Sequence, residues 1–425
     1  MAEVLAEYEN DSTIAQAFAQ LASENLTSSV AGTSTETASP YTISGLSAGY
    51  YLVKDQDGSV TAKGDAYTDI ILEVVDDVSV TVKAEYPSVT KTVSAIDASI
   101  GDTLTYTLTG TVPDTSAYSS YTYIFHDTLS AGLTLVDSSI AVKNGDTTLV
   151  KDTDYTVAVD TTSSSDGSTL ITITMANAKN LSNSTIVVTY NATLNSDAVI
   201  GQGTGEGENG NPNTVYVEYS NNPNWDGDGD EPKGNTPEDK VVTFTFELDV
   251  TKVDNESNKA LANAEFVLYR TEGSTTEYVQ IGTDGKVSGW TTQESDASTL
   301  TSDSTGQFSI IGLDAGTYYL EETAAPDGYN RLSAPVTIVI TAEYKDADGD
   351  GVKDTIDTLT ATADSEDLTT SISEGTVSAT VENKSGSTLP STGGIGTTLF
   401  YIIGSVMVLA AAVLLITKRR MRQVK

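Results

Sequence analysis

The 425-residue sequence has no cysteine, a single histidine, His126, and only 22 lysines and arginines against 60 aspartates and glutamates. Without cysteine, neither disulfide bonds nor thiolate chemistry is available. One histidine gives little support to a zinc site or a Ser-His-Asp triad, so we expect a structural role for His126. The net charge of −38 argues against a nucleic-acid partner, because phosphate recognition needs clustered basic residues.

Threonine, serine, valine, tyrosine and glycine are abundant, and short stretches of alternating apolar and polar residues recur along the chain. This pattern predicts an all-β protein built from antiparallel sandwich or barrel domains. The length is too great for one ordinary domain and suits two or three.

The C-terminus contains an uncharged apolar stretch, IGTTLFYIIGSVMVLAAAVLLIT, at residues 395–417, followed by the basic tail KRRMRQVK at 418–425. The stretch is long enough to cross a bilayer as a helix, and the basic tail would stay in the cytoplasm. The preceding chain then lies outside the cell. Its start, MAEVLAEYENDSTIAQAFAQ, lacks the pattern of a signal peptide, so we expect the first domain to be truncated.

Linkers are predicted near Tyr86-Pro87 and in the polar run at 221–240. The segment ISGLSAGYYLVKD is similar to the later IIGLDAGTYYLEET, which supports a modular organisation. The predicted units are residues 1–86, 87–240, 241–384 and a C-terminal segment, 385–425.

Three polar residues of the third unit stand where core residues are expected. In VTFTFELDVTKVD, every second residue from 244 to 250 is apolar, and Lys252 continues that face. Glu322 in YYLEETAAPDGY and Asn383 in TVSATVENK occupy equivalent positions on their strands. Left without partners in a core, these groups would destabilise the fold.

One chemistry makes use of such a buried set. Burial lowers the pKa of a lysine, which becomes a neutral nucleophile, and raises that of a carboxylic acid, which can then donate a proton. The amine attacks the asparagine amide, which the acid polarises, and ammonia leaves. Folding supplies the proximity, worth up to ~7–11 kcal/mol of the barrier. The product is a lysine–asparagine isopeptide bond; the alternative is a hydrogen-bonded buried acid without a covalent bond.

The segment YYLEETAAPDGY resembles the E-box of Gram-positive pilin subunits, Y-x-L-x-E-T-x-A-P-x-G-Y, at every fixed position. The resemblance implies that residues 241–384 form a collagen-adhesin B-type sandwich with an immunoglobulin-like architecture. It also implies that Glu322 is the catalyst and that Lys252 and Asn383 become linked.

The middle unit has a second set of polar residues in apolar positions: Lys91 in YPSVTKTV, Asp127 in YTYIFHDTLSAGLT and Asn221 in NTVYVEYSNNP. This unit resembles the middle, collagen-adhesin A-like domain of backbone pilins. The expected acid is Asp127 and the expected bond joins Lys91 to Asn221. The choice of asparagine stays open, because Asn213 shares the same strand phase and Asn222 is adjacent.

Just before the apolar stretch, Leu389, Pro390, Thr392 and Gly393 match the L-P-x-T-G sorting signal of sortase substrates. Pro390 favours an extended, accessible segment. The resemblance implies cleavage between Thr392 and Gly393, with the Thr392 carbonyl held as a thioester on the sortase until an amine resolves it.

A polymer would also require a lysine amine, and the segment VTVKAEYPSVTK contains the candidates. Lys83, Pro87 and Lys91 follow one another at steps of four, which resembles the K-x3-P-x3-K arrangement of pilins. The resemblance implies that Lys83 accepts the threonine of the next subunit. Ser88 replaces the familiar lysine after Tyr-Pro, which leaves an ordinary surface lysine as the alternative.

The run DADGDGVKDTID spaces its aspartates as an EF-hand-type loop does. Lys353 stands where an apolar residue is usual, and no helices are expected on either side. A hairpin tip is therefore the preferred interpretation, and calcium is an alternative. No other cofactor is expected. The ligands would be Asp346, Asp348, Asp350, Asp354 and Asp357.

The predicted function is a backbone subunit of a sortase-assembled pilus, polymerised at the cell surface and attached to peptidoglycan. It is not a turnover enzyme, because each intramolecular bond forms once. The expected partners are a pilin-specific and a housekeeping sortase, further copies of the subunit, and the cell wall. The alternative is a wall-anchored adhesin or minor pilin that binds a host ligand.

The Lys83→Ala variant separates these two functions. If Lys83 joins the subunits, the variant loses the ladder of SDS-resistant, high-mass species that the unaltered protein gives on a denaturing gel of wall material. A single band from the unaltered protein, together with ligand binding, would favour the adhesin.

Overall fold

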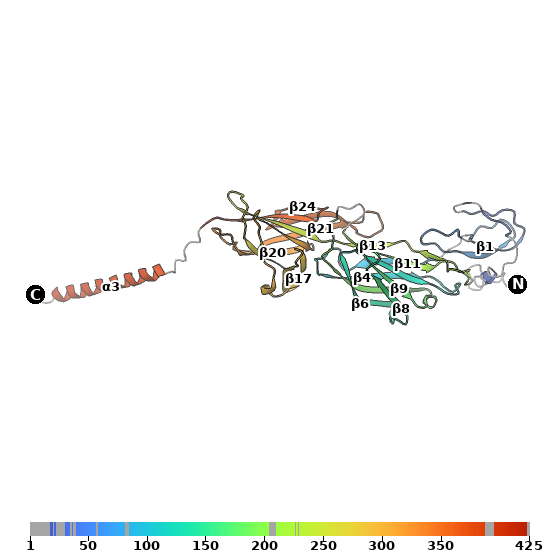
Figure 1. The fold of residues 1–425 in the computed structure, drawn as a ribbon, viewed down its shortest axis with the longest axis horizontal. Helices are drawn as coiled ribbons and strands as arrows, with labels where there is room; N and C mark the ends of the chain where they lie inside the picture. The colour runs from blue at the N-terminus through green and yellow to red at the C-terminus, as the bar shows by residue number, and fades with distance from the viewer. Residues whose placement is uncertain are drawn as a thin grey trace.

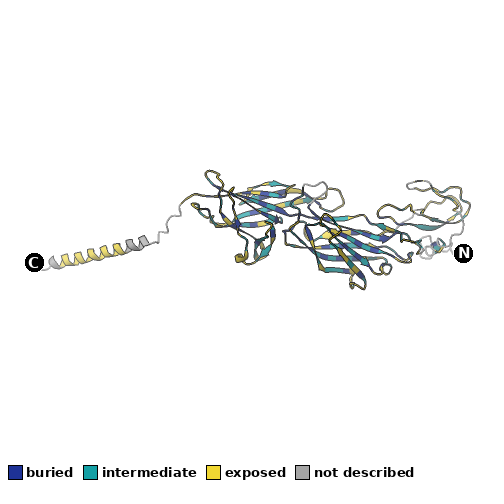
Figure 2. Cartoon of the chain, in the orientation of Figure 1, coloured by how far each residue is buried: buried dark blue, intermediate teal, exposed yellow. Residues whose placement is uncertain are grey.

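The computed structural model describes residues 18–19, 21–22, 30–34, 36, 40–56, 58–80, 85–203, 210–225, 227, 229–386 and 395–422. The domains follow one another along the long axis of the molecule, with the C-terminal helix at the far end (Figure 1). Buried residues concentrate in the sheets of the middle and third domains (Figure 2). The predicted all-β sandwich architecture is therefore confirmed.

The first domain contributes one antiparallel pair, β1 (Gly49–Lys54) and β2 (Asp69–Val74). It contacts the middle domain through backbone and side-chain hydrogen bonds. The Tyr67 amide donates to the Asn221 carbonyl (2.8 Å), and the Tyr219 hydroxyl donates to the Asp65 carbonyl (2.9 Å). The loop after β11 therefore supports the first domain.

The middle domain is a sandwich of two antiparallel sheets. Buried and less buried residues alternate along β9 and β11, so each strand turns one face to the core. The first sheet has the order β3 (Val89–Val93), β4 (Thr103–Val112), β10 (Ser184–Leu194), β6 (Leu133–Asn144), β7 (Thr147–Thr148). The second has the order β12 (Lys233–Asn235), β11 (Asn211–Ser220), β5 (Tyr123–Leu129), β9 (Thr169–Met175), β8 (Tyr155–Asp160), and β13 (Asp239–Thr243) also pairs with β11.

The third domain is also a sandwich, and its first and last strands lie side by side as a parallel pair. The smaller sheet has the order β19 (Gln307–Leu313), β14 (Phe246–Asp254), β25 (Thr376–Asn383), β24 (Thr369–Ser371). The larger has the order β17 (Val287–Thr291), β16 (Thr275–Ile281), β15 (Glu265–Glu272), β20 (Gly316–Ala324), β21 (Val336–Lys345), β22 (Thr355–Ala363), β23 (Glu366–Asp367), with β18 (Leu300–Thr301) paired to β15. Two short 3-10 helices, η1 (Ala178–Leu181) and η2 (Glu294–Asp296), lie in loops of the middle and third domains.

One apolar core runs through both large domains. In the middle domain it includes large buried aromatic residues, among them Tyr106, Tyr123 and Phe125. At the boundary, the Phe244 ring stacks on Tyr344 with ring centroids 5.3 Å apart. The middle and third domains are thus in apolar contact with each other.

The chain ends in the helix α3 (Ile395–Arg422). Its segment Ile402–Arg419, with a mean hydropathy of 1.9, is long and apolar enough to cross a membrane. The predicted C-terminal apolar helix is therefore confirmed. Lys83 and the predicted sorting signal, residues 389–393, lie outside the described residues.

Candidate functional site

The structure brings Lys252, Glu322 and Asn383 together inside the third domain. On the parallel pair β14–β25, Lys252 lies opposite Val381 and Asp254 lies opposite Asn383. Because alternate residues share a face, Lys252 and Asn383 are inward-facing neighbours on adjacent strands. Glu322 reaches them from β20 of the opposite sheet. All three are at most 1% exposed.

In the third domain, hydrogen bonds hold the side-chain amide of Asn383 between the Glu322 carboxylate and a backbone carbonyl. Asn383 Nδ2 donates to both carboxylate oxygens of Glu322 (3.0 and 3.1 Å) and to the carbonyl of Asn330 (2.9 Å). Glu322 also accepts from the Leu332 amide (2.8 Å). Asn383 Oδ1 is buried and has no hydrogen-bond partner. The acid thus contacts the nitrogen that would leave as ammonia.

The amine of Lys252 lies in an environment that disfavours its charge. Its Nζ donates to the Val381 carbonyl (3.0 Å). Burial lowers the pKa of Lys252 to about 8, although the charges of Glu322 and Glu382 oppose this shift. A substantial fraction of Lys252 is therefore neutral near physiological pH, as a nucleophile must be.

In the middle domain, the structure brings Lys91 of β3, Asp127 of β5 and Asn213 of β11 together. Lys91 Nζ contacts the Asp127 carboxylate and donates to Asn213 Oδ1 at 2.6 Å. The Tyr190 hydroxyl accepts from Lys91 Nζ (3.3 Å) and from Asn213 Nδ2 (2.7 Å). Burial lowers the pKa of Lys91, and the neighbouring Asp127 charge opposes the shift. The lysine nitrogen is thus in contact with the amide that it would attack.

The choice of Asn221 as the partner of Lys91 is corrected. Asn221 follows the far end of β11, eight residues after Asn213. At ~3.3 Å per residue, the two asparagines lie about 26 Å apart along the strand. The Asn221 amide donates to the Pro232 carbonyl, at the contact with the first domain. Both asparagines have the same strand phase, so periodicity could not distinguish them.

The pairing register selects Asn213. Val215 lies opposite Asp127, which places Asn213 one inward-facing position from the acid. No feature of the sequence fixes this register, because it depends on the pairing of two strands far apart in the chain. Tyr190 was also not predicted, although its phase in VVTYNATL is that of a core residue.

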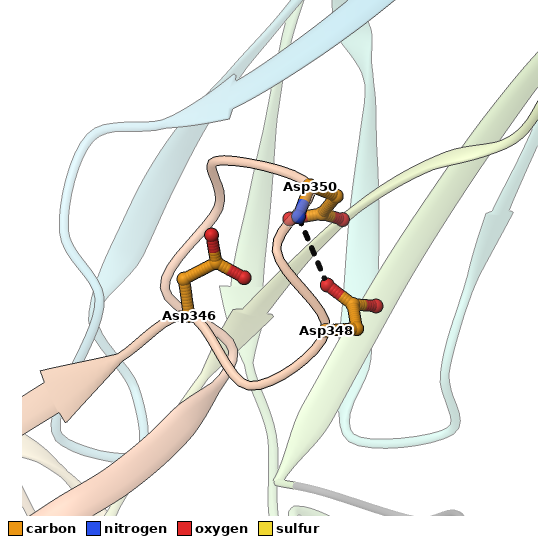
Figure 3. A group of neighbouring side chains, drawn as sticks. All are labelled: Asp346, Asp348 and Asp350. Carbon is orange, nitrogen blue, oxygen red and sulfur yellow. Dashed lines mark hydrogen bonds between the residues drawn. The ribbon is translucent and has the colours of Figure 1, made fainter.

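The aspartate-rich run lies at the tip of the β21–β22 hairpin, as the preferred interpretation predicted (Figure 3). Asp346, Asp348 and Asp350 are exposed, with carboxylate oxygens within 4.8 Å of one another. Asp346 accepts hydrogen bonds from the amides of Gly349 (2.7 Å) and Gly351 (2.8 Å). These bonds stabilise the turn without a ligand.

The other two expected ligands belong to ion pairs. Asp354 is 2.9 Å from Lys240 Nζ, and Asp357 is 3.0 Å from Lys345 Nζ. The structure therefore does not assemble the five-aspartate set expected for calcium. The Lys240–Asp354 pair instead joins β13 of the middle domain to the hairpin of the third.

Three family models match separate parts of the chain. A model of the Gram-positive pilin backbone subunit 2, Cna-B-like domain, matches residues 100–223, and a prealbumin-like fold domain matches residues 246–353. The LPXTG cell wall anchor motif matches residues 381–421. The model that matches the middle domain describes a Cna-B-like domain, whereas the sequence resemblance predicted a collagen-adhesin A-like middle domain.

Among solved structures, the T6 backbone pilin of serotype M6 Streptococcus pyogenes is 19% identical, with a TM-score of 0.54, and the match covers 81% of this chain and 82% of that one. The group B streptococcus pilus 2b backbone protein is 26% identical, with a TM-score of 0.47 and coverage of 71% and 99%. Domains D2 and D3 of the major pilin SpaD from Corynebacterium diphtheriae are 24% identical, with a TM-score of 0.46 and coverage of 70% and 99%. A comparison with curated proteins gave no match.

The lowered pKa of Lys252 predicts how bond formation depends on pH. A neutral amine beside a protonated acid holds the same single proton as an ammonium beside a carboxylate, so the rate at which Lys252 joins Asn383 should be independent of pH just below pH 8 and should fall about tenfold per pH unit above it, where that proton is lost. The chain, isolated unfolded from inclusion bodies, is refolded across this range while intact mass follows the loss of ammonia. The Lys252→Arg variant, which lacks the amine and cannot form this bond, is the control. A rate that rises about tenfold per pH unit up to pH 8 would contradict the transfer of the lysine proton to the acid.

Proposed function

The chain is a Gram-positive pilus backbone subunit with a cell-wall anchor motif, and we propose that its two sandwich domains each close a lysine–asparagine isopeptide bond. The bonds join Lys91 to Asn213 and Lys252 to Asn383. The observation that supports this most strongly is the contact of Lys91 Nζ with both Asp127 and Asn213, inside a core that excludes water.

The reaction begins with a proton transfer inside the buried set. The lysine ammonium passes a proton to the neighbouring carboxylate, which replaces two buried charges by a neutral amine and a neutral acid. The amine nitrogen then attacks Cγ of the asparagine, and the bond from Cγ to Nδ2 breaks. The departing nitrogen takes up one proton from the attacking amine, relayed by the carboxyl group, and leaves as ammonia, and the carboxyl group stays protonated.

The surroundings of each site fit these roles. In the third domain, Glu322 contacts Asn383 Nδ2 through both oxygens and can deliver a proton directly to the leaving nitrogen. In the middle domain, Asp127 contacts the lysine and the Tyr190 hydroxyl contacts Asn213 Nδ2. The acid there is placed to deprotonate the nucleophile, and Tyr190 is placed beside the leaving group.

The positions of the bonds define a covalent path for tension. It enters along β3 to Lys91, crosses to Asn213, follows the chain to Lys252, and crosses again to Asn383. The segments 92–212 and 253–382 lie outside this path. Each bond also closes a loop of more than a hundred residues, which by analogy with a disulfide stabilises the fold by ~4–5 kcal/mol of chain entropy.

The assembly of the pilus rests on residues outside the sandwiches. As a sortase substrate, the subunit is cleaved after Thr392, and Lys83 of the next copy is the amine that resolves the thioester. A pilin-specific sortase makes these links, and a housekeeping sortase makes the final one to peptidoglycan. A backbone subunit is favoured over an adhesin, because the matching pilin-domain model describes a backbone subunit.

The two asparagines of β11 provide a matched test of the middle-domain bond. Asn213→Ala should raise the intact mass, relative to the unaltered chain, by one retained ammonia after correction for the substitution. Asn221→Ala should leave the ammonia count unchanged, because Asn221 lies far from Lys91. An unaltered ammonia count in Asn213→Ala would contradict the proposed bond.

Neighbouring glutamates of β20 provide a second matched test. Glu322→Ala should retain one ammonia and lower the thermal unfolding midpoint of the third domain, because the bond no longer forms. Glu321→Ala changes the adjacent residue, which points to the other face of the strand, and should keep the bond. Full loss of ammonia in Glu322→Ala would show that this acid is dispensable.

A further inference from the structure

The middle domain extends a loop, residues 96–102, into the third domain. The backbone of this loop is bound at two points: the Ala98 amide donates to the Phe244 carbonyl (3.0 Å), and the Ile100 amide donates to the Gly312 carbonyl (3.0 Å). Ile100 is only 2% exposed. A Cβ at Gly312 would lie 2.5 Å from the Ile100 side chain, so position 312 has no space for a larger residue.

The polar groups of the loop are also bound by the third domain. Asp97 accepts from the Tyr344 hydroxyl (2.6 Å) and from the Ala315 amide (3.1 Å). The Ser99 hydroxyl donates to Asp314, and the Asp314 amide donates back to it (3.2 Å). Buried polar groups with partners on both sides of a boundary fix its geometry more strictly than apolar contact alone.

Arg270 of β15 is the central cation of this contact. Its guanidinium donates to Asp102 of the middle domain through both terminal nitrogens (3.4 and 3.3 Å) and to Asp314 (3.3 Å). Its Nε donates to Glu277 (3.1 Å), and its Cζ lies over the Trp290 ring, 4.1 Å from the ring centroid. The planar guanidinium can make this fork and stack at the same time, which an ammonium cannot.

The charges at the boundary make Arg270 necessary. Asp97 and Asp102 come from the middle domain, whereas Asp314 and Glu277 come from the third. Burial raises the pKa of both Asp97 and Asp102, and the hydrogen bonds that these carboxylates accept oppose this shift. Without the arginine, carboxylates on the two sides of the boundary would repel each other at close range.

A second contact lies on a different segment of each domain. The Gln202 and Gly203 amides donate to the carbonyls of Ile372 (3.2 Å) and Ser373 (3.1 Å). Here the backbones cross so closely that a Cβ on Gly201 would lie 2.2 Å from the Gly375 nitrogen. Two separate contacts restrain bending and twisting more than a single linker between domains does.

We propose that loop 96–102 and Arg270 lock the middle and third domains into one rigid body, so that the subunit has no hinge between them. The lock goes beyond the isopeptide bonds, because it acts between the domains and each bond acts within one. Its effect in the polymer is to keep the two domains at a constant angle in every subunit.

The absence of cysteine allows a direct test. Thr148→Cys in β7 and Asp367→Cys in β23, both exposed, place one thiol for a label on each domain of the full chain. Pulsed electron spin resonance then gives the distribution of distances between the labels. We expect one narrow distribution in the unaltered background, and Arg270→Ala should broaden it about twofold or more, as expected for a released domain.

Asp102→Ala removes the middle-domain partner of Arg270 and should broaden the distance distribution in the same way. This variant leaves the third domain unaltered, so it tests the contact even if Arg270→Ala impairs the folding of that domain. Lys143→Ala, an exposed change on β6, is the matched control and should leave it narrow. A narrow distribution in both Arg270→Ala and Asp102→Ala would overturn the lock. Intact mass of the same samples reports the isopeptide bonds separately, so failure of one proposal is distinguishable from failure of the other.

Discussion

The burial of a lysine amine beside a carboxyl group and an amide is the interaction on which the account depends. Lys91 and Lys252 are at most 2% exposed. A buried ammonium costs several kcal/mol unless it is paired, so the sandwich keeps the acid close and favours the neutral amine. The feature that would destabilise an ordinary core is here the condition for the covalent bond that we propose. Apolar packing and the polar triads are therefore parts of a single arrangement.

The bonds and the interdomain contact complement each other mechanically. The proposed isopeptide bonds would remove most strands from the path of tension, and the remaining segment, 213–252, runs through the boundary between the two domains. That boundary contains Phe244, between β13 and β14, and the Lys240–Asp354 ion pair. Bonds alone would give two inextensible units joined by a flexible segment. The contact around Arg270 makes the pair act as one body, as a stiff fibre requires.

The sequence allowed prediction of those features that depend on local periodicity. The all-β class, the apolar helix and the inward positions of Lys252, Glu322 and Asn383 followed from strand phase alone. The partner of Lys91 did not, because Asn213 and Asn221 share a phase and differ only in register, which long-range pairing sets. Asp354 and Asp357 were grouped with the turn aspartates by spacing, yet each is bound by a lysine, Lys240 of the middle domain and Lys345 of the same hairpin. Arg270 could not have been singled out, since its role exists only after two domains dock.

The most direct measurement is tandem mass spectrometry of proteolytic fragments from the folded protein. The account predicts branched fragments in which the lysine nitrogen of residue 252 is joined to Cγ of residue 383, and that of 91 to Cγ of 213, each lacking one ammonia. Linear fragments that contain Lys91, Lys252, Asn213 and Asn383 at their full masses would contradict it.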